Sequence, residues 1–131
     1  MSYTILIADD HDIIREGIKN ILRHQDGYEI VGEAVDGEEV LTKVKELKPD
    51  VLLLDMNMPK RSGLEILDEI KVLSRDTRII IISVHKADAY VLRAIKSGVR
   101  GYLNKENAAD DLLPALRKVT AGQVYLAGEV S

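Results

Sequence analysis

Short apolar runs alternate with helical patterns along the chain, and this alternation restricts the fold more than any other feature of the sequence. The runs lie at 4–8, 28–34, 51–54, 78–83 and 101–105. Strands separated by helices of this length form βαβ units, in which a parallel sheet is covered by helices on both faces. Nearly continuous apolar strands agree, because parallel strands are buried on both sides. With 131 residues, the chain is expected to form one α/β domain.

Helical spacing and capping residues place a helix after each run. Ile14, Ile18 and Ile21 form one face of the first helix. Asp36 and Glu39 have the spacing of a capping box at the start of the second helix. A third helix is expected at 63–73 and a weaker fourth at 86–97, and the last contains Leu112, Leu116 and Val119.

Pro114 complicates the start of the last helix. Proline is tolerated in the first turn of a helix but breaks its interior. We therefore expect the N-terminal cap at Asp110 or Asp111, or else a kink at Pro114. The helix is expected to stop near Gly122, and residues 123–131 have no clear period, as is typical of a linker.

Composition excludes several classes of function. The chain has no cysteine, so it has neither a disulfide framework nor a thiolate metal site. A net charge of −4 argues against a domain that binds nucleic acid by itself. The apolar runs are too short to span a bilayer, and we expect a cytoplasmic protein with no membrane partner.

Polar residues stand where the predicted strands end. The first run is followed by Asp9 and Asp10, the third by Asp55, the fourth ends in Ser83 and the fifth in Lys105. Ligands of such sheets bind outside the carboxyl ends of the strands. We therefore expect these side chains to meet at one edge of the sheet.

Each of these residues also has an ordinary structural interpretation. Asp9 or Asp10 could cap the first helix, and Asp55 could be a turn residue. Three carboxylates together are less ordinary, because each close pair costs about 3–4 kcal/mol at an effective dielectric constant near 20. A divalent cation with oxygen ligands, Mg²⁺ above all, and a lysine would offset that repulsion. Such a group suits phosphoryl transfer to a carboxylate nucleophile.

Two histidines lie near these residues. His11 follows the two aspartates directly, and we favour a loop histidine at the start of a helix over a metal ligand. His85 stands two residues past Ser83, at the rim of the predicted site.

The arrangement resembles that of bacterial response regulator receiver domains. Asp9-Asp10, Asp55 followed by Pro59 and Gly63, then Ser83 and Lys105 occur in that family's order, and the resemblance covers roughly the first 120 residues. It implies a flavodoxin-like, doubly wound, five-stranded parallel sheet of order 2-1-3-4-5 with five helices.

Several segments resemble the NarL/FixJ subfamily: "ADDHDIIREGI", "VGEAVDGEE", "GYLNK" and "LRKVTAGQVYLAGEVS". Members of that subfamily carry a LuxR-type helix-turn-helix DNA-binding domain beyond this point. The resemblance implies a receiver domain at 1–122, then the start of a linker at 123–131 to a domain absent from this chain. DNA would then be bound only through that absent domain.

The resemblance also implies roles at the strand ends. Asp55 would accept a phosphoryl group from a phosphohistidine on a sensor histidine kinase. Asp10, Asp55 and the main-chain carbonyl of Asn57 would ligate Mg²⁺, with Asp9 acting through a bound water.

Three more residues take implied roles. Lys105 would pair with the phosphoryl group, Ser83 would turn its hydroxyl towards it, and Tyr102 would follow as the switch aromatic. The face formed by the fourth helix, the fifth strand and the last helix would then change. A phosphorylated homodimer would form through the first and last helices. Ile13, on the first helix, is apolar but expected to be exposed. The chain would not be an enzyme beyond its own phosphorylation and dephosphorylation.

Alternative functions are a stand-alone receiver, a Mg²⁺-dependent phosphatase with an aspartyl-phosphate intermediate, and an interaction domain with an inert acidic rim. The phosphatase would require a second aspartate two residues after Asp55, where Asn57 stands.

Overall fold

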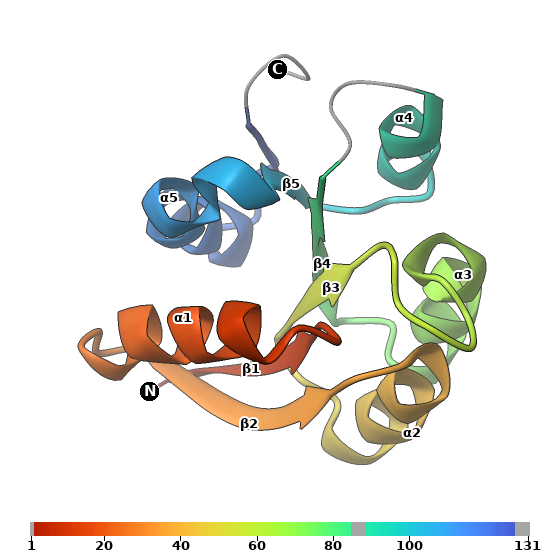
Figure 1. Ribbon diagram of the computed structural model, residues 1–131, viewed down its shortest axis with the longest axis horizontal. Helices are drawn as coiled ribbons and strands as arrows, with labels where there is room; N and C mark the ends of the chain where they lie inside the picture. The colour runs from red at the N-terminus through yellow and green to blue at the C-terminus, as the bar shows by residue number, and fades with distance from the viewer. Residues whose placement is uncertain (1, 85–88, 128–131) are drawn as a thin grey trace.

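The computed structural model describes residues 2–84 and 89–127, apart from the side chain of Tyr90, as one sheet between two layers of helices (Figure 1). All strands of the sheet pair in parallel, in the order β2-β1-β3-β4-β5-β6. The strands are β1 (Tyr3–Ala8), β2 (Tyr28–Ala34), β3 (Val51–Asp55), β4 (Arg78–Ser83), β5 (Gly101–Asn104) and β6 (Tyr125–Leu126).

The helices cover both faces of the sheet, as the alternating pattern predicts. Figure 1 shows α1 and α5 on one face and α2, α3 and α4 on the other. Their bounds are α1 (Asp12–Arg23), α2 (Gly37–Leu47), α3 (Gly63–Leu73), α4 (Ala89–Lys96) and α5 (Ala108–Thr120), with a short 3₁₀ helix η1 (Lys105–Asn107) before α5.

The central strands form the core. Every residue of β3 is buried, and Ile79–Ser83 of β4 are buried as well. Burial of these aliphatic side chains between two helical layers supplies most of the driving force for folding. The carboxyl ends of β1, β3 and β4 are thereby held rigidly side by side, and this positions whatever side chains follow them.

The sheet has one strand more than predicted. Tyr125–Leu126 lie in the segment expected to be a linker, but they pair with β5: the Tyr125 N–H donates to the carbonyl of Arg100 (3.0 Å), and the Ala127 N–H to that of Tyr102 (3.1 Å). The predicted five-stranded order 2-1-3-4-5 is therefore wrong at its end. As a result, β5 is not an edge strand, because it pairs with β4 on one side and with β6 on the other.

The start of the last helix also differs from the prediction. Helix α5 begins at Ala108, directly after η1, so the cap predicted at Asp110 or Asp111 was wrong. Pro114 lies inside the helix. An interior proline costs about 3 kcal/mol, but burial of Leu112, Ala115, Leu116 and Val119 keeps the helix continuous through this residue.

Most other local predictions are confirmed. Asp36 caps α2 by accepting the N–H of Glu39 at 2.8 Å. Gly98 follows α4 with a φ of 96°, the left-handed conformation expected at a helix C-terminus. The predicted fourth helix began at Lys86, which lies outside the described residues, as does His85. No helix in the described part of the chain combines the length and apolar character needed to cross a membrane.

Candidate functional site

The predicted residues meet at the carboxyl edge of the sheet. Asp9 directly follows β1, Asp55 ends β3, and Lys105 directly follows β5. The Lys105 ammonium lies 3.1 Å from Oδ2 of Asp55 and 3.6 Å from Oδ2 of Asp9. Asp55 is fully buried, and only 2% of Asp9 is exposed. The side chains predicted from three separate strands are thus within contact distance of one another.

Asp10 belongs to the same group, which we call the acidic cluster (Asp9, Asp10 and Asp55). Its side chain is the most exposed of the three, at 31%. Arg15 on α1 fixes the loop that carries both acids, because its guanidinium donates to the carbonyl of Asp9 at 2.6 Å and to Oε1 of Glu33 on β2 at 3.0 Å. Neither Asp9 nor Asp10 caps α1; the N-cap position is held by His11.

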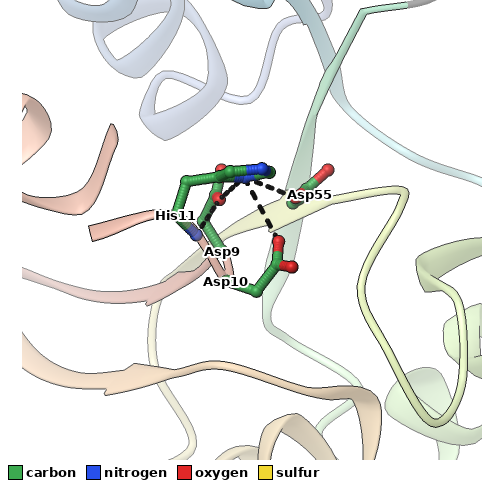
Figure 2. Close-up of side chains that lie close together, drawn as sticks. All are labelled: Asp9, Asp10, His11 and Asp55. Carbon is green, nitrogen blue, oxygen red and sulfur yellow. Dashed lines mark hydrogen bonds and ion pairs between the residues drawn. The ribbon is translucent and has the colours of Figure 1, made fainter. Parts of the chain in front are cut away.

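His11 stands in the loop at the start of α1, as predicted, and its ring also contacts the acidic cluster. Figure 2 shows its Nδ1 directed at all three carboxylates, 2.9 Å from Oδ1 of Asp9, 3.2 Å from Oδ1 of Asp10 and 3.9 Å from Oδ2 of Asp55. Sequence analysis does not predict that the ring of His11 faces the acids. Its position directly after two aspartates was the one signal that could have included it.

The loop between β3 and α3 is held close to Asp55. The N–H of Asn57 donates to Oδ1 of Asp55 at 3.0 Å. A Cβ on Gly63 would lie 3.0 Å from the carbonyl oxygen of Asp55, so any larger residue there would push the start of α3 away from the strand end by a few tenths of an ångström. Lys60 takes a left-handed φ of 69° and pairs with Asp36 at 3.4 Å, which ties the loop to α2.

Burial makes Asp55 electrostatically unusual. Removal from water raises the pKa of its carboxyl group; the Asn57 N–H opposes this, the charge of Asp9 adds to it, and Lys105 opposes it again. The Oδ2 atoms of Asp9 and Asp55 accept no hydrogen bond from the described residues. Two buried carboxylate oxygens without hydrogen bonds are costly, and their shared charged neighbour is Lys105.

The donor atoms suit a divalent cation. Asp9, Asp10, His11 and Asp55 each offer one ligand atom, and these atoms lie within 4.8 Å of one another. Carboxylate oxygens are the ligands that Mg²⁺ prefers. The two buried oxygens without hydrogen bonds are what a bound cation would satisfy, so the residues present fit the expected ion.

Ser83 and Tyr102 lie on adjacent strands beside the cluster. Ser83 is the fully buried last residue of β4 and pairs in register with Asn104 of β5. Tyr102, on β5, pairs with Ile81 and is also buried. The Lys105–Glu106 peptide bond is trans. Ser83 and Tyr102 therefore lie on the strands predicted for them, whereas Lys105, predicted as the last residue of the fifth strand, is the first residue of η1.

Comparison with known proteins shows the family of the chain. Residues 5–117 match the family model of the response regulator receiver domain. The chain is 41% identical over 123 residues to the nitrate/nitrite response regulator protein NarL of Escherichia coli K12, covering 94% of this chain and 57% of that protein. It is 38% identical over 127 residues to the transcriptional regulatory protein DegU of Brevibacillus brevis, covering 97% of this chain and 54% of that protein.

A solved structure shows the same fold. A LuxR-family two-component response regulator from Aurantimonas superposes with a TM-score of 0.91 at 29% identity, covering 99% of this chain and 93% of that one. The chain spans 54 to 57% of the length of the two curated relatives above. With the family model matching most of the chain and the acidic cluster in place, this chain belongs to the family of two-component response regulator receiver domains.

Proposed function

We propose that Asp55 is the phosphoryl acceptor of this receiver domain and that the donor is a phosphohistidine on a sensor histidine kinase. The observation that carries this proposal is the position of Asp55: fully buried at the end of β3, with Oδ2 free of hydrogen bonds from the described residues and 3.1 Å from the Lys105 ammonium. A carboxylate oxygen with these surroundings is open to react on one side and has a cation beside it.

In the proposed transfer, a carboxylate oxygen of Asp55 attacks phosphorus while the bond from phosphorus to the imidazole nitrogen of the donor breaks. Asp55 becomes an acyl phosphate, and the released imidazole takes up a proton. The Asn57 N–H holds the carboxylate in one orientation by donating to Oδ1. Lys105, already beside Oδ2, is placed to neutralise a phosphoryl oxygen once it arrives.

Asp10, Asp55 and the carbonyl of Asn57 would hold Mg²⁺, with Asp9 acting through a water. A divalent cation bound there neutralises negative charge on the phosphoryl oxygens. Ser83 and Tyr102 would respond to the new charge, since both are buried beside the site on β4 and β5. Beyond its own phosphorylation and dephosphorylation, the domain would catalyse no reaction.

The phosphorylated state would act on partners. α1 and α5 flank a cavity of about 150 Å³ lined mainly by aliphatic residues, with Ile13 at 86% exposure on α1. We propose this face for a phosphorylation-favoured homodimer. The similarity to NarL and DegU supports a cytoplasmic transcription regulator whose DNA contacts lie in a separate helix-turn-helix domain, reached through residues 123–131. A stand-alone receiver is the alternative.

Acetyl phosphate with Mg²⁺ provides the test, with intact mass as the readout. The parent should gain one phosphoryl group, and hydroxylamine should remove it, as expected for an acyl phosphate. Asp55→Ala should gain none, whereas Asp68→Ala, at an exposed acid on α3, should label like the parent. Undiminished labelling of Asp55→Ala would contradict the assignment. Continuous turnover of a phosphate ester would indicate a phosphatase instead.

A further inference from the structure

His11 carries the further inference because it brings a nitrogen into a site otherwise made of oxygens. Its Nδ1 is nearer to Asp9 and Asp10 than a salt bridge requires, at 2.9 and 3.2 Å, and it also faces Asp55 at 3.9 Å (Figure 2). The ring is anchored at the N-cap of α1, where its backbone N–H donates to Oδ1 of Asp9 at 2.8 Å. His11 thus contacts the acidic cluster through both its backbone N–H and its imidazole ring.

The buried carboxylate oxygens give an independent indication of a ligand. Oδ2 of Asp9 and Oδ2 of Asp55 belong to side chains at most 2% exposed, and neither accepts a hydrogen bond from the described residues. Lys105 approaches both, but at 3.6 Å from Asp9 it is too far for a hydrogen bond. The site therefore has unsatisfied acceptors on its buried side and an imidazole nitrogen on its open side.

The geometry also suits one ion. Two ligands on opposite sides of a metal, each about 2.1 Å from it, lie about 4.2 Å apart. The four donor atoms lie within 4.8 Å of one another, so a contraction of roughly half an ångström would bring them around one ion. His11 is 58% exposed and lies at the rim, where a cation can enter from solvent.

We propose that His11 is a direct ligand of the cation site through Nδ1, and that its imidazole strengthens the preference of the site for a borderline transition-metal ion such as Ni²⁺ or Zn²⁺ over Mg²⁺. Imidazole nitrogen favours these ions, whereas Mg²⁺ selects oxygen. The inference rests on the cation site of the proposed function and names a class of metal that this chain's own residues select. Carboxylates alone can also bind these ions more tightly than Mg²⁺, so the evidence for a ligand is the part of the preference that depends on His11; a histidine that only hydrogen-bonds Asp9 would add nothing to it.

Calorimetric titration of the untagged protein with Ni²⁺ and, separately, with Mg²⁺ tests the inference. Removing a residue that merely orients a ligand costs roughly 10- to 100-fold in metal affinity, so His11→Ala should weaken Ni²⁺ binding by at least about tenfold. Its Mg²⁺ affinity should stay within about twofold of the parent, since Mg²⁺ uses the oxygens. His24→Ala, at the other end of α1, should match the parent with both metals. Asp10→Asn should weaken both.

Equal effects of His11→Ala on the two metals, or no effect on either, would overturn the inference. Ring-nitrogen NMR of the parent provides a check that needs no variant: Zn²⁺ should shift the Nδ1 resonance of His11, and a shift of Nε2 alone would also overturn it. Labelling by acetyl phosphate and Mg²⁺ is measured in parallel. If the parent labels but shows no His11-dependent Ni²⁺ binding, the ligand assignment fails and the phosphoacceptor function stands. If the parent does not label but does bind Ni²⁺ through His11, the phosphoacceptor function fails and the ligand assignment stands.

Discussion

Asp10 is the carboxylate whose charge is easiest to remove without disturbing packing, because it is the most exposed member of the acidic cluster. Asp10→Asn keeps the size of the side chain and removes one of three mutually repelling charges. Without metal, the variant should be more stable than the parent by about 1 kcal/mol, since Lys105 and His11 offset part of the repulsion. That difference corresponds to a melting temperature higher by about 4 °C.

Thermal melts with and without Mg²⁺ check this prediction. Mg²⁺ at one hundred times its dissociation constant should stabilise the parent by about 2.7 kcal/mol and the variant by less. Asp26→Asn, at an exposed acid remote from the cluster, provides the control and should melt like the parent in both conditions. A metal-free Asp10→Asn no more stable than the parent, with equal responses to Mg²⁺, would show that Asp10 is not part of a repelling, metal-binding cluster.

At the scale of residues, sequence analysis identified the strand-end acids and the lysine but not the direction of the His11 ring. Strand ends are predictable because the parallel sheet forces them to one edge. The ring of His11 is oriented by a loop, in which the backbone N–H and Nδ1 both bond Asp9. Loops have no repeating pattern, so the spacing of residues in the sequence cannot predict where their side chains point.

At the scale of elements, Glu33 connects β2 to α1 through Lys19 and Arg15, each at 3.0 Å. The hydrogen bond from Lys19, followed by that from Arg15, lowers the pKa of Glu33 below its usual value despite partial burial. A lowered pKa means that this carboxylate stabilises the fold above its unfolded-state pKa, near 4.5, and that the contribution is lost as the pH falls through the folded-state value.

Glu33→Gln should therefore destabilise the domain at pH 7 and have a smaller effect at acid pH. The side chain is 35% exposed, so solvent screening limits the difference to roughly 0.5–1 kcal/mol. Urea unfolding at pH 7 and near pH 3 measures it. Glu29→Gln, on the same strand and without an ion pair among the described residues, should show no such dependence on pH. A loss that is the same at both pH values would exclude an electrostatic origin.

Two elements show where sequence patterns stop being informative. Local preference puts Pro114 in the first turn of α5, yet the helix begins six residues earlier, because packing of its buried face outweighs one lost hydrogen bond. β6 contains only Tyr125 and Leu126, too few residues to show an alternation. Its pairing depends on the free backbone N–H and C=O groups along one side of β5, and a sequence pattern does not show which side of a strand is left unpaired in the finished sheet.

At the scale of the whole molecule, the proposed dimer face can be tested with two equally exposed aliphatic residues on opposite faces. Ile13 on α1 is 86% exposed and Val72 on α3 is 85% exposed. Ile13→Glu should weaken self-association of the phosphorylated form by about tenfold or more, equivalent to about 1.4 kcal/mol, because it would bury an unpaired charge in the interface.

Sedimentation after treatment with acetyl phosphate and Mg²⁺ measures this association, and Val72→Glu should sediment like the parent. If Ile13→Glu also sediments like the parent, the interface lies elsewhere, and α4, β5 and α5 become the next candidates. If both variants dissociate the dimer, the effect is one of added negative charge rather than of the α1 surface.

The pairing of β6 with β5 determines how the chain leaves the domain. Ala127 is hydrogen-bonded to the carbonyl of Tyr102, and the Tyr125 hydroxyl donates to Asp111 on α5 at 2.9 Å. The backbone as far as Ala127 is therefore attached both to β5 and to α5. Because Ala127 is bonded directly to the backbone of Tyr102, a displacement of Tyr102 towards or away from the acidic cluster would also displace Ala127, so β6 is placed to report a change at the site on the far side of β5.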